Sequence, residues 1–155
     1  IGIDLKEDQN LEKQKEIFKK LIKLSIELRK PVIVHSRMAE KECIDILEEE
    51  GAKKVIMHCF SGGMNLVKKI IDNKWFITIP ASVKHSEHFQ NIIKITPIEQ
   101  LLCETDSPFL HPDKLRNNTP ENVIESYKKI AEIKKMGLDE AERKIEGNFR
   151  EIFVL

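Results

Sequence analysis

The feature that most constrains the fold of this chain is a regular alternation between short apolar runs that read as strands and longer amphipathic stretches. The expected strands begin near residues 32, 55, 75 and 101, so they recur about every 20 to 26 residues. Between them, apolar residues fall at the spacing of one helix face. Strand and helix repeated at this period predict a right-handed parallel βα array. The sequence therefore predicts an α/β fold.

The expected elements can be bounded from the same pattern. The expected helices cover about 11–28, 39–51, 64–74, 119–135 and 139–153, and the expected strands 32–34, 53–60, 75–81 and 101–104. The first helix is inferred from Phe18, Leu21, Ile22 and Leu28. The strand at 32–34 is continuous in β-branched residues, which suits burial on both faces. In the polar stretch after the third strand, His85 and His88 are expected to be solvated.

Chain length limits how much of a barrel this pattern can form. The chain has 155 residues, whereas a complete eight-stranded βα barrel usually takes about 250. Ile1 to Ile3 resemble the tail of a further buried strand, with Asp4 in the turn that follows. We therefore expect one partial TIM-type barrel domain over 1–155, the C-terminal half from the end of strand 4 to strand 8. Open sheet edges favour association, so the missing amino-terminal half or a second copy is the expected partner.

Composition excludes several classes of protein. Charged residues make up 34% of the chain but the formal net charge is +0, which argues against a protein that grips nucleic acid by charge alone. An odd number of cysteines without framework spacing favours reduced, mostly buried thiols in a cytoplasmic protein. No apolar stretch approaches the roughly 18 to 20 residues of a membrane span.

Polar residues follow three of the expected strands at their carboxyl ends. His35 follows the strand at 32–34, His58 the next strand, and Glu104 and Asp106 the fourth. The carboxyl ends of parallel strands meet at one edge, where barrels and open α/β sheets place their sites. We therefore expect His35, His58 and Asp106 to face a common cleft.

These three side chains predict a divalent metal site. Imidazole and carboxylate together suit Zn, Mn, Mg and related ions. Asp106 could hold or deprotonate a water that the metal makes acidic. Cys59 is the rival ligand beside His58. One residue further along a strand, its side chain would point to the opposite face, so we interpret it as packing.

Candidate phosphate-binding residues lie near the expected ligands. Ser61 and Gly62 precede an expected helix, and their turn either presents N–H groups to an anion or simply connects strand to helix. Arg37 carries a planar fork suited to phosphate, with a surface salt bridge as the alternative. The same ambiguity holds for the basic loop of His111, Lys114 and Arg116.

Three segments of the chain match a known family. PVIVHSR at 31–37, HCFSGG at 58–63 and ETDSPFL at 104–110 occur in an order and spacing that resemble the TatD family of metal-dependent deoxyribonucleases, within the amidohydrolase-like βα barrels. TPENV at 119–123 and AERKIEGNFREIF at 141–153 resemble the closing segments of that family. The resemblance covers essentially the whole chain.

The resemblance implies roles for the matched residues. His35 and His58 would bind one metal of a two-metal centre, Asp106 would bind the other metal and the attacking water, and Glu104 would be a supporting acid. The family's His-x-His pair has no counterpart here. Its bridging Glu would precede IGID, the first four residues of this chain. Asn117 and Asn118 stand where the family often has a Gly-containing turn.

These features together give the expected function. We expect a cytoplasmic, divalent-metal-dependent hydrolase that cleaves DNA phosphodiester bonds, often from the 3′ end, with two metal ions (Mg, Mn or Zn) in the intact protein. Because this chain carries only part of the two-metal site, it is expected to be inactive alone. The alternatives are a related metallohydrolase acting on an amide or ester, and a non-catalytic fragment of the fold.

Overall fold

The computed structural model describes residues 1–153 of the chain. These residues form two compact units, the first Ile1–Ile77 and the second from Thr78 to the end of the described residues. The boundary falls inside a strand, and each unit is described below by itself.

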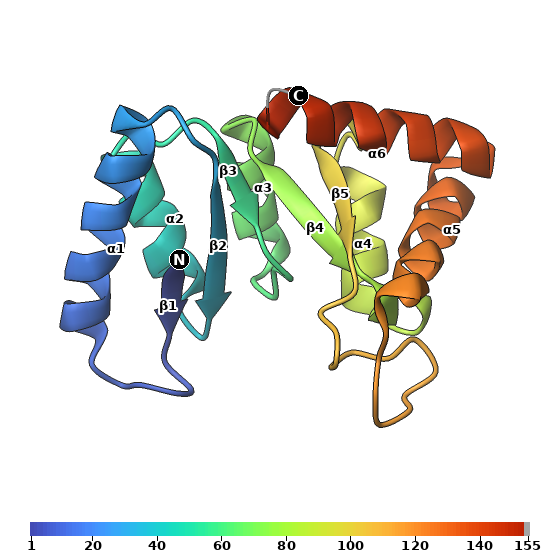
Figure 1. Cartoon of the computed structure of the whole chain (residues 1–155), viewed down its shortest axis with the longest axis horizontal. Helices are drawn as coiled ribbons and strands as arrows, with labels where there is room; N and C mark the ends of the chain where they lie inside the picture. Colours follow the sequence, from blue (N-terminus) through green and yellow to red (C-terminus); the bar gives the residue numbers. More distant parts are fainter. Residues whose placement is uncertain (154–155) are drawn as a thin grey trace. The chain divides into compact units, whose positions relative to one another are not determined.

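The first unit is built from parallel strands joined by helical crossovers (Figure 1). Its strands are β1 (Gly2–Asp4), β2 (Val32–Arg37), β3 (Val55–Met57) and the first residues of β4 (Phe76–Pro80), and neighbours in this order pair in parallel. Its helices are α1 (Leu11–Glu27), α2 (Glu40–Glu49) and α3 (Met64–Asp72). The prediction of an α/β fold with a parallel sheet is confirmed.

Strand β2 is longer than the sequence pattern predicts. It continues to Arg37 because β1 pairs with its second half, with Gly2 opposite His35 and Asp4 opposite Arg37. His35 therefore lies within the strand rather than just past its end. Strand β3 stops at Met57, so His58 does follow its strand as expected.

Helix α1 buries only part of its apolar surface. Phe18 and Ile22 are buried, but Leu21 is 36% exposed and Leu28 is 56% exposed. All four residues were predicted from one helical pattern, yet only the helix face that carries Phe18 and Ile22 is buried. In β2 the expected burial of both faces is also incomplete, since Ile33 is 50% exposed while Val32 and Val34 are buried.

The second unit contains the end of β4, strand β5 (Leu101–Glu104) and most of the remaining helices. These helices are α4 (Glu87–Ile95), α5 (Val123–Lys134) and α6 (Leu138–Phe153), with short 3-10 turns at Ala81–Lys84, Ile98–Gln100 and Pro120–Asn122. Helix α4 was not predicted. Its buried residues Phe89, Ile92 and Ile93 do follow helical spacing. The polar residues around His85 and His88 gave no signal for the start of a helix, so the segment was interpreted as a solvated stretch.

A buried amide fastens α6 to the start of β5. Asn148 Nδ2 donates to the carbonyls of Ile98 (2.7 Å) and Leu101 (2.8 Å). Buried carbonyls outside a helix or sheet ladder need such partners. The amide thus positions β5, whose far end carries Glu104.

Two expectations drawn from composition can be compared with the described residues. Within 1–153, no helix is both long and apolar enough to cross a membrane. All three cysteines lie in this part of the chain and none forms a disulfide, with Cys43 buried and Cys59 and Cys103 partly buried.

Candidate functional site

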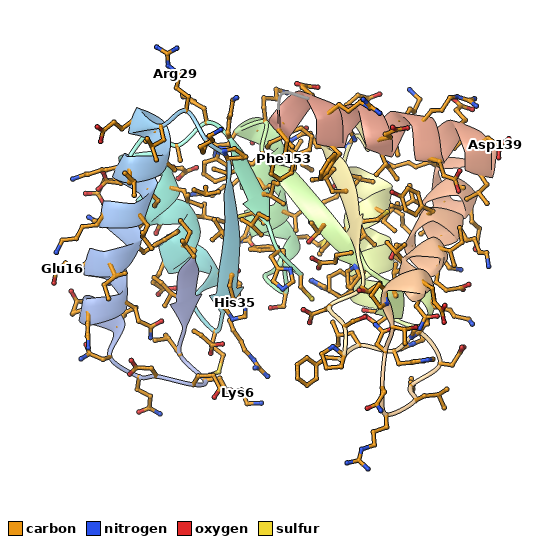
Figure 2. The ribbon with its side chains drawn as sticks, in the orientation of Figure 1. Lys6, Glu16, Arg29, His35, Asp139 and Phe153 are labelled. Carbon is orange, nitrogen blue, oxygen red and sulfur yellow. The ribbon has the colours of Figure 1, made fainter. Side chains whose placement is uncertain are left out.

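The first unit brings His35 and His58 side by side. His35 lies in β2 and His58 directly follows the neighbouring strand β3, and the backbone N–H of His58 donates to Val34 O (2.9 Å). Their ring centroids are 6.1 Å apart and the ring planes are inclined by 31°. Figure 2 shows His35 near the carboxyl end of β2, at the opposite end from Arg29. The predicted pairing of these two imidazoles at a strand-end edge is present.

Asp4 contacts His35 directly, which the sequence analysis did not foresee. Its Oδ2 lies 2.8 Å from His35 Nε2. The parallel register of β1 and β2 puts Asp4 beside this ring, because Gly2 lies opposite His35. The available signal was the Asp at the end of a short strand, which the sequence analysis interpreted only as a turn residue.

The carboxylate of Asp4 is held by two further groups. Its Oδ1 accepts the backbone N–H of Lys6 (2.9 Å) and of Glu7 (3.1 Å). Burial raises the pKa of Asp4, but hydrogen bonds from His35, Glu7 and Lys6 outweigh it and leave the pKa below its usual value. The group is therefore an anion at neutral pH.

The donor set fits a divalent metal in chemistry but not in number. Two imidazoles side by side are the ligand type that Zn and related ions prefer. Across residues 1–153, however, no group of three or more His, Cys, Asp or Glu side chains is arranged to hold an ion. His35 and His58 thus supply two nitrogen donors, and further ligands are needed to complete a site.

The phosphate-binding candidates of the first unit already have local partners. Arg37 Nη1 lies 3.9 Å from Glu7 Oε1, and both side chains are well exposed. Ser61 Oγ donates to Glu40 Oε1 (2.6 Å). A Cβ at Gly62 would lie 2.5 Å from the Phe60 ring, so packing alone accounts for that glycine.

Cys59 requires a correction in the reason given for excluding it as a ligand. The sequence analysis placed it on the opposite strand face from His58. Because β3 ends at Met57, Cys59 instead lies in the turn beyond the strand, with a positive φ of 43°. Strand alternation therefore does not decide where its side chain points.

The acidic candidates, Glu104 and Asp106, belong to the second unit. Glu104 is the last residue of β5, and its carbonyl accepts from Ser126 Oγ (3.4 Å). Asp106 lies two residues on, with a positive φ of 59° and a carbonyl that accepts from Phe109 N (2.9 Å). Both are partly buried. Their meeting with His35 and His58 in a common cleft stays a prediction.

The loop after Asp106 is organised around Asn118. This buried amide donates to the carbonyls of Thr105 (2.8 Å) and Phe109 (2.7 Å). Its Oδ1 accepts from Thr119 N and from Asn122 Nδ2. Asn118, one of the two Asn residues noted as a departure from the family pattern, therefore shapes the loop. Arg116 is exposed on the same loop.

Comparison with known proteins places these residues in a family. The family model described as "TatD related DNase" matches residues 1–154. The chain belongs to the TatD-related DNase family. The resemblance inferred from the three motifs is thus confirmed.

TatD relatives extend beyond the part that this chain matches. The chain is 39% identical over 153 residues to an uncharacterized metal-dependent hydrolase of Methanocaldococcus jannaschii, covering 99% of this chain and 60% of that protein. It is 36% identical over 129 residues to the deoxyribonuclease TATDN3 of Homo sapiens, covering 83% and 47%. The chain therefore spans about half to three fifths of these relatives.

Solved TatD structures share the fold. A TatD homolog from Escherichia coli K12 aligns with a TM-score of 0.92 at 23% identity, covering 100% of this chain and 62% of that one. A TatD-family hydrolase from Entamoeba histolytica aligns with a TM-score of 0.86 at 23% identity, covering 99% and 61%. Whether the strands close into a barrel, of which this chain is the C-terminal half, stays a prediction.

Proposed function

We propose that this TatD-family chain contributes to a divalent-metal-dependent hydrolase that cleaves phosphodiester bonds in DNA. The observation that carries the proposal is the pair of imidazoles, His35 and His58, 6.1 Å apart between ring centroids. Family membership supports the reaction class, since one relative is named a deoxyribonuclease and another a metal-dependent hydrolase.

Each candidate residue has a role in this proposal. His35 and His58 hold a divalent ion, which when bound would activate water and stabilise charge on phosphoryl oxygens. Asp106 contributes to the second position of a two-metal centre and takes the proton of the attacking water. Glu104 supports Asp106 as a second acid at the end of β5.

Cationic and polar side chains near these residues receive the phosphate in the proposed complex. Arg37 exchanges its long contact with exposed Glu7 for a phosphate, since an exposed ion pair contributes little, about 0–1 kcal/mol. Ser61, Gly62 and Arg116 are the further phosphate-binding candidates. Phosphate contacts by Arg37 and Arg116 distinguish this reaction from hydrolysis of an amide or ester.

The test measures cleavage of a labelled single-stranded oligonucleotide with Mg²⁺, Mn²⁺ or Zn²⁺ and after EDTA. It uses this chain and the whole open reading frame that encodes it. In whichever of these two proteins cleaves DNA, EDTA should abolish the cleavage activity. His58→Ala or Asp106→Asn should lower that activity by at least about tenfold. His88→Ala removes an imidazole of α4 that has no role in this proposal and serves as the control.

The alternatives give different results in the same assay. Cleavage of ester or amide substrates without DNA cleavage would favour the related metallohydrolase. Metal-independent behaviour, or no effect of His58→Ala on metal binding, would favour a non-catalytic fold.

We also propose that the 155-residue chain has little activity alone, because its described residues present only two imidazoles side by side. The proposal extends to association with a further segment or a second copy, and to a cytoplasmic location, which fits three cysteines outside any disulfide. Robust turnover with two tightly bound metal ions in this chain would refute the partial-site proposal.

A further inference from the structure

The loop between β5 and the turn that precedes α5 exposes an aromatic ring. This loop, residues 105–119 of the second unit, carries neither helix nor strand (Figure 1). Phe109 is 69% exposed, more than any other large apolar residue of the described chain. One exposed apolar side chain needs no partner by itself. The backbone around Phe109 and the charges on the loop indicate what this ring binds.

The backbone that carries Phe109 is held on both sides. Phe109 N donates to Asp106 O (2.9 Å), and Phe109 O accepts from Asn118 Nδ2 (2.7 Å). Asn118 N also donates to Pro108 O (2.9 Å). The conformation of this part of the loop is therefore fixed before any ligand arrives. A preorganised loop costs less conformational entropy when it binds.

The middle of the loop is tied to the 3-10 turn at Ala81–Lys84. Lys84 Nζ contacts Asp113 Oδ1 (2.6 Å), and His85 Nδ1 lies 3.1 Å from Pro112 O. The hydrogen bond from Lys84 outweighs desolvation and holds the pKa of Asp113 below its usual value. The carboxylate of Asp113 is thus ionised and already paired with a cation.

Two cations of the loop stay available for a ligand. Lys114 and Arg116 are exposed, and neither forms an ion pair with another residue of 1–153. Arg116 is two residues from Asn118, so the Cα atoms of these two residues lie within about 7 Å of each other. Because Asn118 donates to Phe109 O, the guanidinium and the aromatic ring project from the same anchored part of the loop.

An aromatic face beside a free guanidinium fits one nucleotide of a single strand. An unpaired base stacks on the ring, and its phosphate accepts hydrogen bonds from the cation. A duplex keeps its base faces stacked inside, so this site selects unpaired DNA. An apolar protein partner would use the ring and the leucines of the loop, but it would leave both cations without an anion.

We propose that Phe109 is a specificity-determining residue that stacks on an unpaired base of single-stranded DNA, while Arg116 contacts the adjoining phosphate. This inference rests on the proposed function in one respect, namely that the ligand is the DNA that the protein cleaves. The backbone hydrogen bond from Phe109 to Asp106 puts the stacking residue next to the proposed acid.

The test measures binding without cleavage. Fluorescence anisotropy follows a labelled single-stranded oligonucleotide of mixed sequence in EDTA, at one fixed salt concentration. It uses this chain and the protein of the whole open reading frame that encodes it. Phe109→Ala should weaken binding by about 5- to 100-fold, and Phe109→Tyr, which keeps the ring, should stay within about twofold of wild type.

Leu115→Ala is the matched control for this variant. Leu115 is 65% exposed on the same loop but offers no aromatic face, so its truncation should change affinity by less than about twofold. Because both side chains are mostly exposed, urea titrations should show wild-type stability for both variants.

An abasic oligonucleotide separates stacking from phosphate contact. It keeps the phosphates and removes the bases, so wild type and Phe109→Ala should bind it equally. Arg116→Gln should weaken binding to both oligonucleotides, because its phosphate contact does not depend on a base. A duplex of the same sequence should bind the wild-type protein more weakly than the single strand does.

Several results would overturn this inference, whatever the protein cleaves. They are equal affinity of wild type and Phe109→Ala for the intact oligonucleotide, an equal loss in Leu115→Ala, and no binding by either wild-type protein. Binding that depends on Phe109, in a protein that cleaves no DNA with any of the metals, supports the stacking role and counts against the proposed hydrolase.

Discussion

Asn118 organises the loop after β5 with its two donors and one acceptor oxygen. Replacing it by Ala leaves the carbonyls of Thr105 and Phe109 without their amide partner. A net hydrogen bond contributes about 0.5–1.5 kcal/mol, so the loss of both costs roughly 1–3 kcal/mol. Asn118→Ala should therefore lower the free energy of unfolding by about that amount in urea titrations.

The neighbouring Asn117 gives a control of the same residue type. It is exposed whereas Asn118 is buried, so Asn117→Ala should change stability by less than about 0.5 kcal/mol. Equal stability of the two variants would show that the buried amide does not organise the loop.

The cysteines differ in their expected reactivity. Burial raises the pKa of Cys43 to about 12, and burial also raises the pKa of Cys103. The thiolate is the reactive form. At pH 8 a thiol reagent should therefore modify Cys59 first in the native chain. Mass spectrometry of the peptides from the modified chain measures the order of reaction. In urea all three should react at similar rates; early modification of Cys43 in the native chain would contradict its burial.

At the scale of elements, α2 and α3 are joined by a charged cluster around Lys69. Lys69 Nζ contacts Glu48 Oε2 (2.9 Å) and Asp45 Oδ1 (3.3 Å). Asn73 also donates to Glu48. Hydrogen bonds from Lys41 and Lys69 lower the pKa of Asp45, and those from Lys69 and Asn73 lower the pKa of Glu48.

This cluster predicts a pH dependence of stability. Because the folded pKa values of both carboxyls lie below their unfolded values, their contribution is present above the unfolded pKa, roughly 4, and is lost as pH falls through the folded pKa. In Lys69→Met the folded pKa values rise toward normal, so stability should fall less steeply between about pH 5 and pH 3. Urea titrations at each pH measure this.

Lys68 is the matched control because it is exposed and forms no ion pair among the described residues. Lys68→Met should keep the wild-type pH dependence. A Lys69→Met chain with the wild-type slope would show that the cluster does not couple to folding.

Among the elements, those with a repeated apolar pattern were predicted well from the sequence, and features that depend on contacts with another element were not. The apolar run that begins at Leu101 predicted β5 with its observed bounds, Leu101–Glu104. The end of β2 was missed because it depends on pairing with β1, and α4 was missed because polar residues surround its start. The His35–His58 pairing was predictable from strand ends. The Asp4 contact was not, because it depends on the register between two strands.

At the scale of the whole molecule, the exposed apolar residues of α1 predict association. Ile17 (47%), Leu21 (36%), Leu24 (47%) and Leu28 (56%) are exposed at a spacing of four, three and four residues. Such a stripe is typical of a helix that packs on another helix. Sedimentation velocity should show association that increases with concentration, and Leu24→Lys should shift the chain toward monomer.

Glu12→Gln provides the control for charge. It changes net charge by the same amount as Leu24→Lys, at a position whose side chain is 85% exposed. A compact monomer at all concentrations would argue against an interaction through this face.

The close approach of Gly2 to the carbonyl of His35 also determines which sequences this fold can accept. In a saturation-mutagenesis library screened for folded chains, position 2 should retain glycine alone. Alanine should be depleted as strongly as tryptophan, because the first carbon added already meets the backbone oxygen at 1.8 Å. Tolerance at this position would depend on backbone geometry rather than on side-chain size or polarity.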